Sequence, residues 1–486
     1  MSTHYEAIII GTGFAGIGMA QALLAEGISN FVLLEKQHDV GGVWRENSYP
    51  GAACDVPSHL YSFSFEPKPD WTHRYARQGE ILAYLQHCAH KYGATERTRF
   101  GAEVKRADYD EATRQWTVEL STGQHLSARL LISAVGQLSR PALPALPGME
   151  SFAGPSFHSA TWRHDVDLRG KRVGVIGTGA SAVQFVPTIA PDVAKLSLFQ
   201  RSAPYLLPRM DRRYPAWEQA LYRRLPWLQA LSRARLWVFY DLRAIAFTRW
   251  TSLMRVAGLL PFRMLLKKQV ADPALRVRLT PDYPIGCKRL LVSSNYLPAL
   301  TRPNVELVTE RIEAVVPEGV RTADGRVHAC DALIFGTGFA ATEFLAPMEI
   351  RGSGGHSLNE VWAGKPGAYL GISVAGFPNF FMLYGPNTNL GHNSIVYMIE
   401  SQVRHVMRCV REMRGSGASR VEVRSDAVKT SVDEVQQGLK HTVWQGCKSW
   451  YLNESGYNPT NWHSFCFSYR WQALREKLGS VYEFQR

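Results

Sequence analysis

The sequence predicts an α/β fold built from two doubly wound parallel sheets, with the second unit inserted into the first. Two glycine-rich turns, at residues 11–16 and 177–182, each follow a buried-strand pattern and precede a helical run. Two further strand-and-glycine segments, 130–144 and 332–339, flank the second unit. A strand, glycine turn, helix and second strand in this order form the fingerprint of dinucleotide-binding, Rossmann-like domains.

The composition is that of a folded protein with a large core. The chain has 486 residues, of which 45% are hydrophobic and 20% are charged, so more than one domain is expected. The sequence contains no run of about 18 uncharged apolar residues, so we expect no membrane-spanning helix. The N-terminal MSTHYEAIIIGTG has no basic region ahead of its apolar run. We interpret it as a first strand rather than a signal peptide and expect a cytoplasmic protein.

The cysteines favour a reduced protein. Their number is odd and no CxxC pair occurs, so we expect neither a disulfide framework nor a zinc site, and no other metal. The seven are Cys54, Cys88, Cys287, Cys330, Cys409, Cys447 and Cys466.

The net charge of +13 is unevenly distributed. Residues 205–268 contain 13 Lys+Arg and 3 Asp+Glu, a net +10, together with Trp217, Trp227, Trp237 and Trp250. One interpretation is a helical subdomain with a solvated basic face, and the other is weak peripheral contact with a membrane surface or an anionic partner. Nucleic acid is not expected, because no recognition motif accompanies the charge.

The first glycine turn has the spacing GxGxxG. Gly11 permits a tight turn, Gly13 lets the backbone approach a pyrophosphate, and Gly16 lets helix and strand pack closely. The helix N-terminus offers N–H donors to phosphates. Glu35 ends the next strand and can accept hydrogen bonds from ribose hydroxyls. The candidate cofactor-binding residues here are Gly11, Gly13, Phe14, Ala15, Gly16 and Glu35.

The second turn differs from the first where the acid would stand. Arg201 occupies that position, followed by Ser202. An acid there would repel a 2′-phosphate, whereas arginine offers it a bidentate donor pair, so NADPH is expected over NADH. The candidate residues of this turn are Gly177, Thr178, Gly179, Ala180, Ser181 and Ala182.

Two nucleotide sites in one chain indicate FAD and NADPH, with a hydride passing from the nicotinamide to the flavin. We assign residues 1–140 to the first part of an FAD-binding domain and 141–340 to an NADPH-binding domain with a helical insertion at about 205–285. Residues 341–486 then complete the FAD-binding domain and supply substrate loops. Disulfide reductases share this plan, but they need a cysteine pair beside the flavin, and Cys54 has no such neighbour.

Two longer motifs make the chain resemble the class B flavoprotein monooxygenases and, within them, the type I Baeyer–Villiger monooxygenases. Phe152, Gly154, His158 and Trp162 match the linker fingerprint FxGxxxHxxxW. Residues 41–55 match a second signature, with Gly41, Gly42, Trp44, Tyr49, Pro50, Gly51 and Asp55 in place. The resemblance covers about residues 6–400. Arg163 departs from the Pro or Asp usual after the linker tryptophan.

The resemblance implies roles for individual residues. Arg289 matches the cation that stabilises the peroxyflavin, Asp55 the acid that positions this arginine, and Lys288 a contact to the NADPH 2′-phosphate. For His158 we favour a structural hydrogen-bonding role over proton transfer. Trp44 and Tyr61 match positions that line the flavin, and Gly42, Val43, Val104 and Gln137 are further candidates for cofactor contact.

The predicted function is that of an NADPH-dependent flavin monooxygenase of the Baeyer–Villiger type. It would use FAD, NADPH and O2 to convert a small organic ketone to an ester or lactone through a C4a-peroxyflavin. A fixed cation beside the peroxide favours its anionic form, which attacks a carbonyl carbon. The alternatives are a flavin-dependent N- or S-monooxygenase and a non-catalytic, membrane-associated flavoprotein.

Overall fold

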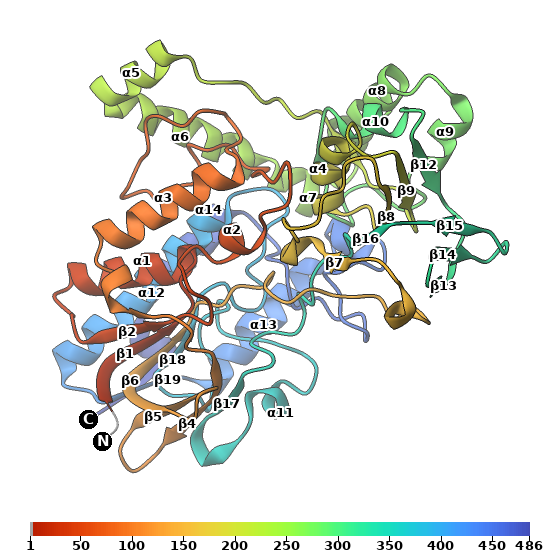
Figure 1. The fold of residues 1–486 in the computed structure, drawn as a ribbon. Helices are drawn as coiled ribbons and strands as arrows, with labels where there is room; N and C mark the ends of the chain where they lie inside the picture. Colours follow the sequence, from red (N-terminus) through yellow and green to blue (C-terminus); the bar gives the residue numbers. More distant parts are fainter. Residues whose placement is uncertain (1–2) are drawn as a thin grey trace.

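The computed structural model describes residues 3–486, so the first two residues of the predicted FAD-binding domain lie outside it. Two α/β domains lie side by side, the first at the lower left of Figure 1 and the second at the right. The described chain begins and ends in the first domain. Within the described residues, no helix is both long and apolar enough to cross a membrane.

The first domain contains a sheet of eight strands in the order β17-β4-β5-β6-β1-β2-β3, with β18 also paired to β6. Strands β1, β2, β3, β6 and β18 are parallel, while β5 runs antiparallel to β4 and β6. Strands β17 and β18 come from the chain after residue 340. The strands are β1 Thr3–Ile10, β2 Phe31–Leu34, β3 Thr98–Arg99, β4 Val104–Asp110, β5 Gln115–Leu120, β6 His125–Ser133, β17 Glu349–Arg351 and β18 Phe380–Met382.

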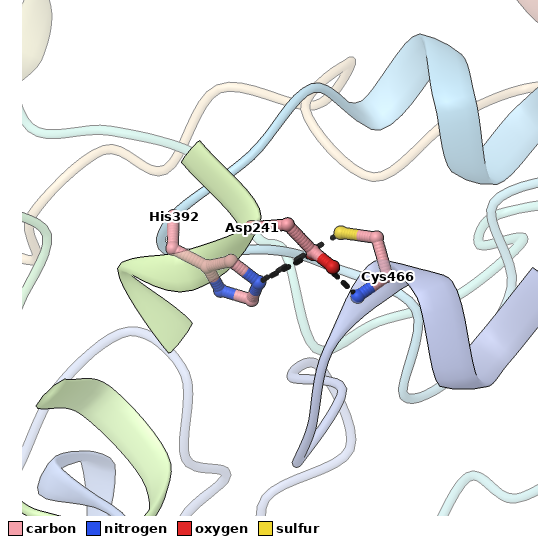
Figure 2. A group of neighbouring side chains, drawn as sticks. All are labelled: Asp241, His392 and Cys466. Carbon is pink, nitrogen blue, oxygen red and sulfur yellow. Dashed lines mark hydrogen bonds and ion pairs between the residues drawn. The ribbon is translucent and has the colours of Figure 1, made fainter. Parts of the chain in front are cut away.

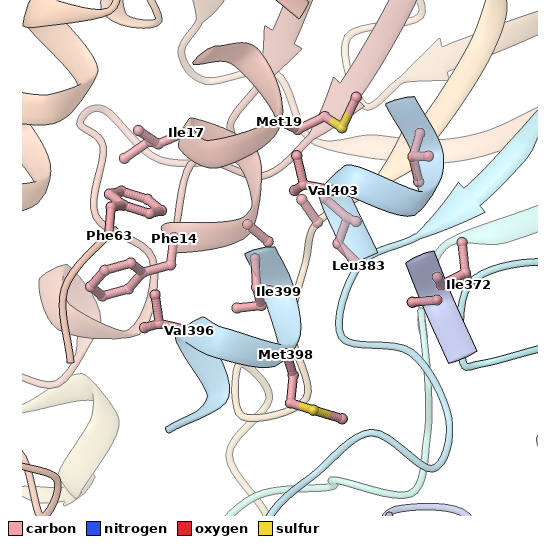
Figure 3. Packing of buried hydrophobic residues seen from close by; sticks show 14 of the residues in the cluster. Phe14, Ile17, Met19, Phe63, Ile372, Leu383, Val396, Met398, Ile399 and Val403 are labelled. Carbon is pink, nitrogen blue, oxygen red and sulfur yellow. The ribbon is translucent and has the colours of Figure 1, made fainter. Parts of the chain in front are cut away.

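Helices α1 (Phe14–Ala25) and α12 (Ile395–Ser416) pack together in the core of this domain. Figure 3 shows Phe14 of α1 beside Val396 of α12, while Ile17 lies on the side of Phe63. Buried apolar residues recur along α12 at helical spacing and form the face that packs against α1. This packing places the N-terminus of α1 at the carboxyl end of β1.

The second domain contains a parallel sheet in the order β12-β9-β8-β16-β7. Its strands are β7 Ser156–His158, β8 Arg172–Ile176, β9 Lys195–Phe199, β12 Val305–Val308 and β16 Ala332–Phe335. Helices α4 (Ala180–Ile189) and α10 (Tyr296–Leu300) pack against each other, and a small antiparallel sheet follows, with β13 Ile312–Val316, β14 Gly319–Thr322 and β15 Val327–Ala329. The predicted fold class, two doubly wound dinucleotide-binding domains, is confirmed.

The helical insertion leaves the second domain after β9. Its two ends are held together by the parallel pair β10 (Leu206–Leu207) and β11 (Leu291–Val292). Helices α5, α6 and α8 lie along the upper edge of the molecule in Figure 1. The helices are α5 Ala216–Arg224, α6 Pro226–Leu242, α7 Ala244–Thr248, the π-helix η4 Arg255–Leu259, α8 Leu260–Gln269 and α9 Pro273–Arg278.

Short elements complete the chain. Near the first domain these are α2 Val43–Glu46, α3 Gln78–Lys91, η1 Thr95–Arg97, η5 Ser353–Gly355 and α11 Leu358–Trp362, and in the linker η2 Met149–Ser151 and η3 Ser159–Thr161. The C-terminal part adds β19 Arg420–Val423, α13 Ser425–Leu439, η6 Val443–Gln445, α14 Cys466–Arg475, α15 Leu478–Val481 and β20 Tyr482–Gln485.

The prediction of a protein without disulfides is wrong. Cys287 and Cys447 form a disulfide across 160 residues, with their Cα atoms 5.9 Å apart. The other five cysteines are free and buried. Spacing along the sequence carried no sign of the bridge, because only the fold brings the loop before Lys288 against the C-terminal segment.

Candidate active site

A cavity of about 1410 Å³ is lined by residues of both domains. Its walls include the turn after β1, the turn after β8 and the loop that carries Lys288 and Arg289. Each turn stands at the carboxyl end of a parallel strand, which is where open α/β sheets bind their ligands. The cavity therefore joins the two predicted nucleotide sites in one continuous space.

The first turn is shaped for close approach of a ligand to the backbone. Gly11 has φ +101°, and a Cβ there would lie 2.8 Å from the Ala134 carbonyl oxygen. A Cβ on Gly16 would collide with the Gly11 carbonyl oxygen. Gly16 does not line the cavity and acts in the helix–strand packing, whereas Gly11, Gly13, Phe14 and Ala15 do line it. This wall fits a pyrophosphate at the N-terminus of α1.

Glu35 follows β2 and is held beside the same turn. One carboxylate oxygen accepts hydrogen bonds from the Thr12 N–H at 3.1 Å and the Thr12 hydroxyl at 2.6 Å. The other accepts from the Gln37 N–H at 3.1 Å. Glu35 also lines the cavity, so a buried acid stands where a ribose would be bound.

The remaining predicted flavin contacts line the next part of the wall. The Trp44 indole donates to the Tyr61 hydroxyl at 3.1 Å, which fixes both rings. The Gln137 amide donates to the Gly385 carbonyl oxygen at 3.2 Å, while its buried Oε1 has no partner in the described chain. An unpaired buried acceptor of this kind fits a site completed by a bound group. Gly42, Val43 and Val104 also line the cavity.

The second turn repeats the geometry of the first. Gly177 has φ +108°, and a Cβ there would collide with the Gly336 carbonyl oxygen. Ala182 is fully buried and does not line the cavity, so this predicted contact lies behind the wall. The residues of this turn that do line it are Gly177, Thr178, Gly179, Ala180 and Ser181.

Arg201, Ser202 and Lys288 come together at the end of β9, although Lys288 lies 86 residues beyond Ser202. The Lys288 ammonium donates to the Ser202 hydroxyl at 3.2 Å. Burial, and then the neighbouring Arg201 cation, lower the pKa of Lys288. Two neighbouring cations, with the Lys288 ammonium destabilised in this way, form a site for a phosphate-type anion.

Arg289 and Asp55 form an ion pair in the cavity wall, 234 residues apart in sequence. The Arg289 guanidinium donates from Nη2 at 2.6 Å and from Nε at 3.0 Å to the same Asp55 oxygen. Burial would raise the pKa of Asp55, but Arg289 outweighs it and the pKa is lowered. The Asp55 carboxylate raises the pKa of Arg289. Both groups are therefore ionised, and both side chains remain 29% exposed.

The linker fingerprint lies outside the cavity wall. A Cβ on Gly154 would lie 2.5 Å from the Asp331 carbonyl oxygen. His158 ends β7, where its Nδ1 accepts from the Ala160 N–H at 3.1 Å, and burial lowers its pKa. Trp162 packs on Phe185, and Phe152 packs against the second sheet. These contacts favour the structural role predicted for His158.

The sequence did not reveal how residues 49–55 are held against the second domain. Gln184 of α4 accepts from the Tyr49 hydroxyl at 3.0 Å and from the Ala53 N–H at 3.2 Å. A Cβ on Gly51 would collide with the Thr188 hydroxyl, also on α4. The glycine signature could have indicated this close approach, but nothing in the sequence pointed to α4 as the partner.

Asp241 of α6 lies between His392 and Cys466, as Figure 2 shows, and it also contacts Asn393, which lines the cavity. Its carboxylate accepts from the Cys466 N–H at 2.8 Å, at the start of α14, and from the Asn393 amide at 3.3 Å. His392 lies 3.7 Å from the Cys466 sulfur. Burial, and then Arg243, lower the His392 pKa to about 3, so this imidazole is neutral. The buried carboxylate is thus accounted for as a cap of α14.

Comparison with known proteins agrees with this geometry. The family of flavin-binding monooxygenase-like proteins matches residues 5–237. A Baeyer–Villiger monooxygenase of Pseudomonas aeruginosa is 46% identical over 480 residues, which cover 98% of this chain and 90% of that protein.

Two solved structures superpose over the whole chain. A steroid monooxygenase bound to NADP has a TM-score of 0.89 at 32% identity, and OTEMO in complex with FAD and NADP has a TM-score of 0.90 at 29% identity. Each covers 100% of both chains. The cavity lined by both domains of this chain, with the Arg289–Asp55 pair in the wall, agrees with the similarity. The similarity to these proteins shows that the chain belongs to the type I Baeyer–Villiger monooxygenases.

Proposed function

We propose that this enzyme uses FAD, NADPH and O2 to convert a small organic ketone to an ester or lactone. The observation that carries the proposal is the Arg289–Asp55 pair, which lies in the wall of the cavity lined by both glycine turns. The residues of the cavity suit both cofactors. Flavin monooxygenases that oxidise nitrogen or sulfur need the same cofactors. The Arg289 cation therefore distinguishes ketone oxygenation from heteroatom oxygenation.

Different residues of the chain would bind the FAD and the NADPH. The turn at 11–16, with Glu35, Trp44, Tyr61 and Gln137, would hold the FAD, and the turn at 177–182 would hold the NADPH. Arg201, Ser202 and Lys288 would bind the 2′-phosphate. We accordingly assign residues 1–140 and 341–486 to the FAD-binding domain and 141–340 to the NADPH-binding domain.

Bound FAD, once reduced by NADPH, is the group that activates O2. Arg289 would stabilise negative charge on the oxygen that attacks the ketone carbonyl. Its Nε and Nη2 groups are used by Asp55, while Nη1 makes only a 3.5 Å contact with the Leu390 carbonyl oxygen. Nη1 can therefore donate to an anion in the cavity. Asp55 is a positioning residue, because it acts through Arg289.

Oxygenation of nitrogen or sulfur remains the alternative. That reaction needs a protonated oxidant, and a permanently charged guanidinium in the cavity favours the anionic one. A panel of cyclic and linear ketones and sulfides, with NADPH consumption and product mass measured together, separates the two. Esters or lactones with one added oxygen per NADPH support the proposal. Efficient sulfoxide formation without ester from any ketone contradicts it.

We also propose a cytoplasmic location, supported by the requirement for NADPH. In addition, we propose that residues 205–268 make peripheral contact with an anionic surface. The exposed side chains of this segment support that contact and define its chemistry.

A further inference from the structure

The exposed apolar side chains of this protein are concentrated in the helical insertion. Of the 22 large hydrophobic side chains that are at least about a third exposed in the described residues, 14 lie between Met210 and Met264. Scattered exposed apolar residues are normal on a protein surface, but a concentrated set marks a binding surface. The 14 are Met210, Trp217, Leu221, Leu225, Trp227, Leu231, Val238, Phe239, Leu242, Trp250, Leu253, Val256, Leu260 and Met264.

Helix α6 carries an apolar face that points away from the protein. Trp227, Leu231, Val238 and Leu242 are separated by four, seven and four residues, so they lie on one side of the helix. They are 60, 50, 46 and 55% exposed. The opposite side is buried and includes Tyr240. Helix α6 is thus anchored on one side and leaves an apolar stripe uncovered on the other.

A second stripe follows on η4 and α8. Val256, Leu260 and Met264 recur every four residues and are 66, 52 and 64% exposed, with Trp250 nearby in sequence at 64%. The other side of α8 buries Phe262, Leu265 and Leu266 in the core of the second domain. In Figure 1, α5, α6 and α8 lie along the same edge of the molecule. We call this edge the amphipathic rim and define it as the exposed side chains of residues 210–268.

The charges of the rim have one sign. Its exposed cations are Arg212, Arg213, Arg223, Arg224, Arg235, Arg249, Arg255, Arg263, Lys267 and Lys268. The three acids of the segment face the protein. Glu218 is 8% exposed and accepts from Arg212, Asp241 is 5% exposed and caps α14, and Asp211 accepts from the Tyr75 N–H. The outward surface therefore combines cations with apolar side chains.

Charge decides which partner fits this rim. A second copy of the chain would bring the same cations together across a symmetric interface, which is unfavourable. An anionic bilayer neutralises the cations, accepts the apolar stripes at its interfacial region, and lets long arginine and lysine side chains reach the headgroups. No described helix can span the membrane, so the helices would lie in the interface.

We propose that the amphipathic rim docks this enzyme onto an anionic lipid bilayer, with the α6 stripe and the 256–264 stripe entering the headgroup region. This inference rests on the surface contact proposed for residues 205–268 and does not depend on the oxygenase reaction. The tryptophans Trp217, Trp227 and Trp250 suit the polar–apolar boundary of a membrane.

The test uses the FAD-loaded full chain and vesicles of phosphatidylcholine, alone or mixed with phosphatidylglycerol. Co-sedimentation is expected with the anionic vesicles only and should weaken as salt is raised, because exposed charges are screened. The variants Trp227→Ser/Leu231→Ser and Val256→Ser/Leu260→Ser should each reduce the partition coefficient by about tenfold or more, since each loses two apolar side chains that the bilayer would bury. The control Val327→Ser/Val361→Ser removes two exposed apolar groups outside the helical insertion and should bind as the wild type does.

Several outcomes would overturn the proposal. These are equal binding to uncharged vesicles, binding that salt does not change, and rim variants that sediment like the control. A dimer in light scattering that the rim variants dissociate would assign the surface to a second copy instead. NADPH-dependent ketone oxidation measured in solution separates this result from the proposed reaction. Rim variants should keep the wild-type rate of ketone oxidation. If the wild type oxidised no ketone, the proposed reaction would fail, but the vesicle-binding result would still stand.

Discussion

Arg289 donates two hydrogen bonds to a single oxygen of Asp55, although 234 residues separate them. This arrangement occupies one edge of the guanidinium and leaves Nη1 with only a long contact to a carbonyl oxygen. The two charges also stabilise each other, since each shifts the pKa of the other toward its ionised form. The pair therefore delivers a fixed, oriented cation to the cavity wall.

Replacing Arg289 by alanine should separate the two halves of the reaction. Hydride transfer depends on the two nucleotide sites and should persist, whereas ester formation should fall by two to three orders of magnitude, about 3–4 kcal/mol of lost electrostatic stabilisation. Stopped-flow reduction under anaerobic conditions, followed by mixing with O2 and product analysis, measures both halves. Asp55→Ala should act in the same direction but more weakly.

Arg289→Ala also leaves Asp55 without its partner in a desolvated position, so the fold could be affected. The double variant Arg289→Ala/Asp55→Asn removes that unpaired charge and serves as the control. If either variant with full flavin content forms ester at the wild-type rate, the role assigned to Arg289 is wrong.

The preference for NADPH should depend on Arg201 and Lys288. A charge-assisted contact to phosphate contributes about 1.5–3 kcal/mol, so Arg201→Ala should lower kcat/KM for NADPH by about tenfold or more. The value for NADH should change little, because NADH lacks the 2′-phosphate. Steady-state kinetics with both cofactors test this, and equal use of NADH and NADPH by the wild type would contradict the assignment.

The lowered pKa of Lys288 predicts a pH dependence of NADPH binding. Lys288 binds phosphate only when protonated, and its pKa lies below the usual lysine range. The KM for NADPH should therefore rise as the pH increases through that lowered pKa, while the KM for NADH stays flat. Lys288→Arg keeps the cation charged and should remove the rise. A rise of equal size for NADH would point to another group.

Flavin binding should fail when Gly11 becomes alanine. The residue has φ +101°, and the new Cβ would lie 2.8 Å from the Ala134 carbonyl oxygen in the wall of the FAD site. Gly27→Ala is a matched control, because Gly27 has φ +75° and a Cβ there would meet no atom within 4 Å. The wild type and Gly27→Ala should be yellow, and Gly11→Ala should contain little flavin by absorbance. A fully loaded Gly11→Ala would place the FAD elsewhere.

Reduction of the Cys287–Cys447 disulfide should lower the Tm. Closing a long loop in the unfolded chain contributes about 2–5 kcal/mol of stability. The paired variant Cys287→Ser/Cys447→Ser should have the lower Tm without reductant and show no further change on its addition. Peptide mass analysis without reductant should find the two cysteines linked. A Tm that dithiothreitol does not change would contradict the prediction.

The two glycine turns, Glu35 and Arg201 could be recognised from the sequence because their function is local. A strand, a tight turn and a helix N-terminus form one short segment, and the residue at the end of the next strand stands at a fixed distance from it. Asp55 and Arg289 were assigned by their resemblance to family motifs. The sequence also located the basic, tryptophan-rich segment, since composition alone shows it.

Only the tertiary structure decided which distant segments meet. Three contacts join residues more than a hundred positions apart. They are the Cys287–Cys447 disulfide, the hydrogen bond between Gln184 and Ala53, and the capping of α14 by Asp241. It also decided that Gly16 and Ala182 lie behind the cavity wall and that the three acids of residues 205–268 face inward. Local patterns record the conformation of one segment. The direction of a side chain and its partner depend on how separate segments pack, and that information is distributed over the whole chain.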